Sequence, residues 1–326
     1  MKFLSTLLKG FGCLVFLILI IIFAMAIVPS TPVQYTPSSP PCKTYEEALQ
    51  RYQSLLAATP SDVREICRPF ILTHDKKTPQ VFVLLHGLTN CPEQFRKLAE
   101  ELHAQGHSVV VPLTPFHGNE NRLTDKLENL TVEQMLQSAD KAIAIAHGLG
   151  DKVTLVGLST NGATVAWYAQ NTQIIDRAVL LAPFLGVHHF PEHYLPYLAN
   201  FVGRLPNHFF WWNPKLKQDI PGPPYAYPRA PSKPIAKILL LAQQVTQQAA
   251  VTAPKTRKIA VVTTASDVVI NEGAVTTLVN EWNRSLKVTT YEFPAADKVP
   301  HDMIDPHQPD QKVDLVYPVL LKLLNE

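Results

Sequence analysis

Twelve residues, from Asp151 to Gly162, constrain this chain more than any other segment. They read DKVTLVGLSTNG, and ATVAWYA follows them. The β-branched apolar run that ends at Gly157 predicts a buried strand, and the residues after Gly162 predict a helix. Ser159 then lies at the apex of a sharp turn between them. Such a turn lifts the serine hydroxyl out of a sheet and leaves the Thr160 N–H free at a helix N-terminus, where an oxyanion can be held.

This stretch resembles the nucleophile elbow of α/β-hydrolases, with one departure. The usual Gly-x-Ser-x-Gly pattern would place glycine at 161, but this chain has Asn161 and then Gly162. Small residues are wanted there because strand and helix approach closely, and asparagine is larger, although it tolerates unusual backbone angles. The turn alone therefore fits both a catalytic serine and a structural βα turn.

A second segment, Val81 to Phe95, resembles the oxyanion loop of the same family. A buried strand over 81–85 runs into His86-Gly87, and a helix opens at Pro92. The resemblance implies that Leu88 donates its backbone N–H to an oxyanion together with Thr160. It also implies that His86 shapes the loop and is not the base. An ordinary His-Gly turn is the alternative.

The third segment supplies an acid and a base. Asp267 follows a predicted strand over 258–264, and His301 lies in the loop after a predicted strand over 287–293. Family members carry their triad in the order Ser, Asp, His, with acid and base after the last strands. The spacing leaves room for a cap before Asp267 and for one helix, about 272–285, before His301. The predicted triad is Ser159, Asp267 and His301.

Other acids and histidines compete for these roles. His307 is the best rival base, but it follows Asp305-Pro306, further from the strand end. Among the acids, Asp297 and Asp302 are close to His301 in sequence, and Asp302 is expected to point elsewhere. Four histidines of the predicted cap could line a pocket: His188, His189, His193 and His208.

Together these motifs resemble α/β-hydrolases of the carboxylesterase and monoacylglycerol-lipase kind, from about residue 67 to the C-terminus. Further matching parts are Pro92-Glu-Gln-Phe95, Pro115-Phe-His-Gly118 and His301-Asp302, and the cap segments Phe210-Trp-Trp-Asn-Pro214 and Tyr225-Ala-Tyr-Pro-Arg229 are similar to bacterial membrane-anchored or exported members. The resemblance implies a serine hydrolase that cleaves carboxylic esters through an acyl-enzyme on Ser159. Such an enzyme needs no metal and no organic cofactor.

The alternation of strand and helix signals predicts the α/β-hydrolase fold, a mostly parallel sheet flanked by helices, with an inserted helical cap. Strands are predicted near 67–73, 81–85, 108–112, 153–157, 177–182, 258–264 and 287–293. Helices are predicted near 92–105, 131–148, 160–171, 272–285 and 311–324. The alternation breaks at about 186–255, which is rich in proline and aromatics. These aromatics fit both an apolar pocket for a medium or long acyl chain, as in a monoacylglycerol or lysolipid, and a core of the cap itself.

The N-terminus is expected to stand apart from the domain at 42–326. Lys2 and Lys9 precede a charge-free apolar run, Phe11 to Val28, so residues 1–28 fit a transmembrane anchor or a cleaved signal peptide. Both place the domain outside the cytoplasm, membrane-anchored or exported. Residues 29–41 contain five prolines and are typical of an extended tether.

Three cysteines follow the tether: Cys42, Cys67 and Cys91. An oxidising compartment permits one disulfide among them. We expect Cys67–Cys91, which would tie the first strand to the oxyanion loop, while Cys42–Cys67 stays open. No Cys-x-x-Cys pair suggests a zinc site.

Net charge is +2 and the basic residues are scattered, which argues against nucleic acid as a partner. A small-molecule ester or lipid, and the membrane through the N-terminal segment, are the expected partners. Two other functions stay open: an exported serine peptidase of the same fold, and a non-catalytic relative that binds an apolar ligand. Asn161 is the one feature that favours a non-catalytic relative. The presence of serine, acid and histidine together argues against it, because a binding module has no need of all three.

Overall fold

The computed structural model describes residues 2–325, with side chains described at residue 11 and from residue 13 onward. The central sheet has seven strands in the order β1-β3-β2-β4-β5-β8-β9, of which β1 runs antiparallel to β3 and the other neighbours are parallel. The strands are β1 (Phe70–Leu72), β2 (Thr78–Leu85), β3 (Ser108–Val111), β4 (Gly150–Leu158), β5 (Arg177–Leu181), β8 (Lys258–Thr264) and β9 (Thr289–Phe293).

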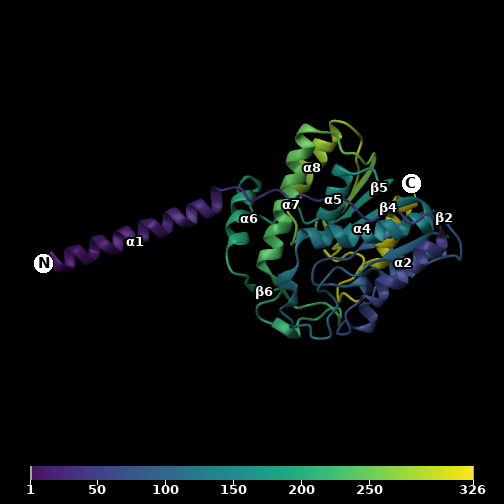
Figure 1. Ribbon diagram of the computed structural model, residues 1–326, viewed down its shortest axis with the longest axis horizontal. Helices are drawn as coiled ribbons and strands as arrows, with labels where there is room; N and C mark the ends of the chain where they lie inside the picture. Colours follow the sequence, from purple (N-terminus) through teal and green to yellow (C-terminus); the bar gives the residue numbers. More distant parts are fainter. Residues whose placement is uncertain (1, 326) are drawn as a thin grey trace.

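Helices cover both faces of this sheet (Figure 1). They are α2 (Tyr45–Ala57), α3 (Arg96–Ala104), α4 (Val132–Leu149), α5 (Thr160–Asn171), α8 (Glu272–Asn283) and α9 (Val313–Asn325). The period of two along β2 divides its side chains. Val81, Val83 and Leu85 join the core under α4, α5 and α8, whereas Phe82 and Leu84 join the core under α3 and α9. Burial of both faces explains why the strands read as continuous apolar runs. The predicted α/β-hydrolase sheet is confirmed.

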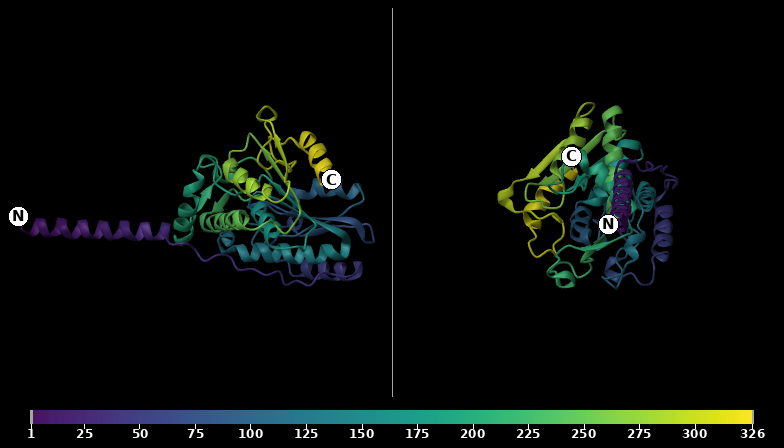
Figure 2. Two further views of the ribbon diagram at one scale, coloured as in Figure 1. Left: turned by 90° about the horizontal axis from the view of Figure 1, so that it is seen from above. Right: turned by 90° about the vertical axis from the view of Figure 1, so that its left-hand side faces the viewer.

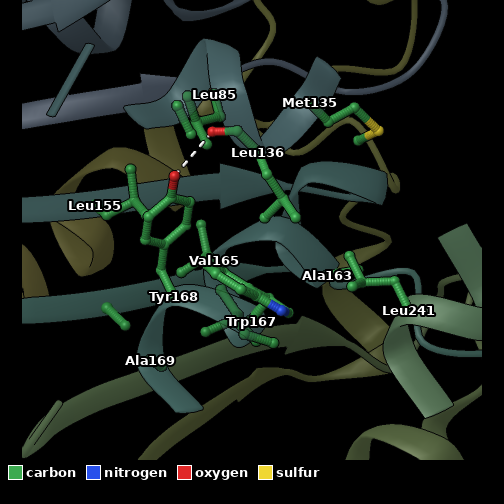
Figure 3. Packing of buried hydrophobic residues seen from close by; sticks show 14 of the residues in the cluster. Leu85, Met135, Leu136, Leu155, Ala163, Val165, Trp167, Tyr168, Ala169 and Leu241 are labelled. Carbon is green, nitrogen blue, oxygen red and sulfur yellow. Dashed lines mark hydrogen bonds between the residues drawn. The ribbon is translucent and has the colours of Figure 1, made fainter. Parts of the chain in front are cut away.

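The helix that begins directly after Ser159, α5, is held on both sides by buried hydrogen bonds. Tyr168 donates its hydroxyl proton to the carbonyl of Leu136 on α4, at 2.8 Å, beside the sheet residues Leu85 and Leu155 (Figure 3). On the other side, Trp282 of α8 donates its indole N–H to the side chain of Gln170, at 2.8 Å. These contacts hold the C-terminal half of α5 against α4 and α8.

The segment between β5 and β8 forms a cap at the carboxyl end of the sheet. It contains α6 (Leu195–Arg204), the antiparallel pair β6 (Phe209–Trp211) and β7 (Arg229–Pro231), and α7 (Ser232–Val251), which packs on α6, α5 and α8. A helical cap was predicted, but the strand pair was not. Each strand is three residues long and its partner lies across a proline-rich loop, so neither has a period that a sequence pattern reveals.

The first predicted strand is wrong in its extent. The strand expected at 67–73 begins only at Phe70, since Glu65–Cys67 forms a 3₁₀ turn. Pro69 has no N–H to donate to a neighbouring strand, which favours a start after it.

The N-terminal helix α1 (Lys2–Ile27) projects away from the domain on the side of the cap (Figures 1 and 2). Its end is held against α6: the Arg204 guanidinium donates to the carbonyls of Met25, Val28 and Pro29. The segment predicted as an anchor or signal, residues 1–28, includes Met1, which lies outside the described residues. Within the described part of the chain, no helix is long and apolar enough to span a membrane.

The expected disulfide is present. Cys67 and Cys91 are bonded, and Cys42 is buried without a disulfide partner. The bond links the turn before β1 to the loop that follows β2, and Tyr225 of the cap packs against it. The pairing Cys67–Cys91 is confirmed, and the alternative Cys42–Cys67 is wrong.

We expect this disulfide to contribute measurably to stability. Its partners are 24 residues apart, and closing a loop of that length in the unfolded chain corresponds to about 3 kcal/mol in the chain-entropy model. Replacing both cysteines by serine should lower the free energy of unfolding in urea by roughly that amount. A reductant should lower the wild type to the same level and leave the variant unchanged. Equal unfolding midpoints for the wild type and the variant in the absence of reductant would contradict a stabilising role.

Candidate active site

The turn between β4 and α5 holds Ser159 in a strained conformation. Its backbone angles are φ 57° and ψ −119°, a region that a residue with a side chain rarely adopts. Three backbone hydrogen bonds fix the turn: Ser159 N–H donates to the Leu181 carbonyl at 2.9 Å, and the Ser159 carbonyl accepts from Gly162 and Phe184 at 2.8 and 2.9 Å. The predicted sharp turn with serine at its apex is therefore present.

The close approach of strand and helix falls on Gly157 and Gly162. A Cβ at Gly157 would lie 2.4 Å from the Asn161 carbonyl oxygen, and a Cβ at Gly162 would lie 2.6 Å from Pro183. The second glycine of the motif is thus required at position 162, one position later than in the usual pattern. The Asn161 side chain points to the neighbouring loop, where its amide donates to the His86 carbonyl at 2.6 Å. Asn161 consequently connects the serine turn to the segment that carries Leu88.

Ser159, His301 and Asp267 lie together, as the sequence predicted. The His301 ring places Nε2 2.9 Å from Ser159 Oγ and Nδ1 2.7 Å from Asp267 Oδ2. The other carboxylate oxygen of Asp267 accepts backbone N–H groups from Val269 and Ile270, at 2.7 and 3.2 Å. Asp267 is 3% exposed and Ser159 is 7% exposed. This arrangement can pass a proton from the serine hydroxyl to the imidazole while the carboxylate holds the ring in place.

The electrostatics of the pair favour a charged imidazole. Burial lowers the pKa of His301, but the hydrogen bond and charge of Asp267, with the charge of Asp302, raise it above its usual range. Burial likewise opposes ionisation of Asp267, but its hydrogen bonds and the charge of His301 hold its pKa below the usual range. The carboxylate therefore stays ionised beside the imidazole.

Both residues predicted as oxyanion donors lie beside Ser159. Leu88 and Thr160 line the same cavity as Ser159. The Leu88 N–H donates to the Thr160 hydroxyl oxygen at 3.1 Å. Thr160, which carries one of the two backbone donors, thus holds the other donor, the Leu88 N–H, with its side-chain hydroxyl.

The rival base His307 lies elsewhere. His307 contacts Asp305 and Tyr225. His86 accepts the Thr114 N–H on Nε2, so it shapes the loop, and burial with the nearby His117 lowers its pKa to about 3. Among the four cap histidines, His188 is the one that lines the cavity over Ser159 in the described chain.

A cavity of about 750 Å³ opens above Ser159 and His301. Its wall under the cap is apolar, with side chains contributed by α6 and α7: Leu198, Ala199, Val202, Ile235, Ala236 and Leu239. Polar side chains also line it, among them Thr89, Asn90, Asp302 and Gln308. The cavity can therefore take a ligand with an apolar part and a polar part.

A largely parallel sheet with serine, acid and histidine at the ends of β4, β8 and β9 defines the α/β-hydrolase class. Residues 80–270 match the family model for the alpha/beta hydrolase fold, and the chain belongs to this family. No curated protein matches the chain in sequence.

Solved structures similar to this chain include lipolytic enzymes. A monoacylglycerol lipase from Paleococcus ferrophilus is 20% identical, with a TM-score of 0.60 over 78% of this chain and 97% of that one. A metagenome-derived lipolytic enzyme is 16% identical, with a TM-score of 0.59 over 81% and 99%. A soluble variant of the Saccharomyces cerevisiae monoglyceride lipase is 12% identical, with a TM-score of 0.57 over 79% and 91%. At these identities the likeness establishes the fold.

Proposed function

We propose that this protein is a serine hydrolase that cleaves carboxylic esters through an acyl-enzyme on Ser159. The observation that carries the proposal is the hydrogen-bonded series Ser159–His301–Asp267, whose serine and histidine line a cavity. His301 takes the Ser159 proton as the hydroxyl oxygen attacks the ester carbonyl, and Asp267 stabilises the imidazolium that forms. The N–H groups of Leu88 and Thr160 hold the oxyanion. His301 then gives the proton to the leaving alcohol, and a water molecule repeats the steps to release the acid.

The apolar wall of the cavity supports an ester with a medium or long acyl chain, such as a monoacylglycerol or lysolipid. Each methylene that enters an apolar site gains about 0.8 kcal/mol. The similarity to monoacylglycerol lipases agrees with this substrate class.

We further propose that the domain works outside the cytoplasm, with residues 1–28 as its membrane anchor or export signal. The Cys67–Cys91 disulfide supports an oxidising compartment. The charge-free apolar run between Phe11 and Val28 supports both forms of export.

A panel of 4-nitrophenyl esters of increasing chain length tests the substrate class. We expect kcat/KM to rise roughly tenfold for every two methylenes that enter the cavity. Ala236→Leu, which narrows the cavity at its apolar wall, should reduce activity on long-chain esters and leave activity on the acetyl ester unchanged. A flat profile in the wild type would contradict an acyl-chain site. Cleavage of aminoacyl-arylamides without ester cleavage would instead favour an exported peptidase.

A further inference from the structure

A second carboxylate lies beside the triad. Asp302 follows His301 directly and lines the cavity that contains Ser159. Its oxygens accept hydrogen bonds from the side-chain amides of Gln308 at 2.7 Å, Gln94 at 3.2 Å and Asn90 at 3.5 Å. All three donors are neutral, so they hold the side chain in place without cancelling its charge.

Gln94 connects this carboxylate to the loop that carries Leu88. Its Nε2 donates to Asp302, and its Oε1 accepts the Gly87 N–H at 2.8 Å. Gln94 is fully buried, so its amide has no access to solvent. An ionised carboxylate can only accept hydrogen bonds, so Asp302 requires the NH₂ group of Gln94 to face it. The amide oxygen must then face Gly87, which fixes the backbone directly before Leu88.

We propose that Asp302 is a positioning residue. Through Gln94 it couples the loop that carries His301 to the loop that carries Leu88. The inference rests on the proposed serine-hydrolase function. It gives Asp302 two effects. The hydrogen bonds through Gln94 hold the Leu88 N–H at the place where the oxyanion forms, and the negative charge next to His301 stabilises the imidazolium.

The charges around the two loops make the second effect measurable. Asp267 and Asp302 are the carboxylates that act on His301, and both raise its pKa. Burial raises the pKa of Asp302, whereas the charge of His301 and the hydrogen bonds from Asn90 and Gln94 lower it, and the charge of Asp267 raises it further. The charge of Asp302 in turn raises the pKa of Asp305 and of Tyr225. Neutralising Asp302 should therefore lower the pKa of His301, because one of the charges that favours imidazolium is removed.

The experiment is the pH dependence of inactivation by a fluorophosphonate probe, which needs no knowledge of the natural substrate. The acid limb of the rate reports the protonation of His301 in the free enzyme. Asp302→Asn should lower the plateau rate about tenfold to a hundredfold, somewhat less than the loss of a whole oxyanion donor, and should move the acid limb to lower pH. Gln94→Met should lower the plateau but leave the limb in place, since Asp302 keeps its charge.

Asp305→Asn is the matched control. Asp305 is a buried acid of the same loop, but it bonds Tyr225 and His307 and makes no hydrogen bond with Gln94 in the described chain. It should leave the limb close to that of the wild type. If Asp302→Asn keeps both plateau and limb, or if Gln94→Met reacts at the wild-type rate, the positioning role is overturned while labelling of the wild type still supports the triad. A folded wild type that is not labelled would overturn the proposed function itself.

Discussion

Replacing Ser159 by alanine is expected to abolish labelling by a fluorophosphonate probe and to lower ester turnover by roughly 10⁴-fold to 10⁶-fold. The Ser159 hydroxyl is the one serine oxygen within hydrogen-bond distance of His301 in the described chain, at 2.9 Å. Without it no acyl-enzyme forms, and only the oxyanion donors and the cavity remain to assist attack by water. The measurement is the labelling of purified protein, beside kcat on the best ester of the panel.

Ser266→Ala provides the control for this variant. Ser266 follows β8 and donates its hydroxyl to the Ala295 carbonyl, away from the imidazole. It should be labelled like the wild type. Undiminished labelling of Ser159→Ala would place the reactive group on another side chain. Normal ester turnover in that variant would exclude the acyl-enzyme mechanism.

Asp267→Asn is expected to lower kcat by about 10⁴-fold while the protein stays folded. The asparagine oxygen can still accept the N–H groups of Val269 and Ile270, which now bond to Asp267. Its NH₂ group, however, would face His301 Nδ1 and favour the tautomer with the proton on Nε2. That tautomer cannot take the proton of Ser159. Turnover at saturating ester, together with thermal unfolding, separates the chemical effect from a loss of structure.

The same variant has a predictable pH dependence. The hydrogen bond and charge of Asp267 raise the pKa of His301, so their loss lowers that pKa and moves the acid limb of the residual activity to lower pH. Asp297→Asn is the comparison. Asp297 is the rival acid near His301 in the sequence, and it lies in the short turn after β9, whereas Asp267 bonds the imidazole. Wild-type turnover in Asp267→Asn, with a loss in Asp297→Asn, would assign the acid role to Asp297.

The sheet was largely predictable because its strands are buried on both faces. Val81, Phe82, Val83, Leu84 and Leu85 read as one apolar run, and each of them is 0–2% exposed. The positions of Ser159, Asp267 and His301 were also predictable in kind, since the ends of parallel strands meet at one edge of a sheet. The paired strands of the cap were not, because their short segments depend on a partner from across the loop.

The supporting contacts of the candidate site lie beyond sequence reasoning for a different reason. Asn161 bonds a carbonyl 75 residues earlier in the chain, and Gln94 bonds a carboxylate 208 residues later. An asparagine in place of glycine looked like a defect in the elbow, and an aspartate after His301 was expected to point elsewhere. Their side chains acquire a purpose only when the fold brings distant loops together. A local pattern contains no signal for such partners.

The hydrogen bond between the Leu88 N–H and the Thr160 hydroxyl bears on selectivity between ground state and transition state. A donor that already has a partner is released only to a better acceptor. A neutral ester carbonyl gains little by replacing a hydroxyl oxygen, whereas a full negative charge gains considerably more. The exchange of partners would then occur late, as the carbonyl oxygen becomes charged. Binding energy at this position would lower the barrier to reaction and leave the affinity for intact ester almost unchanged.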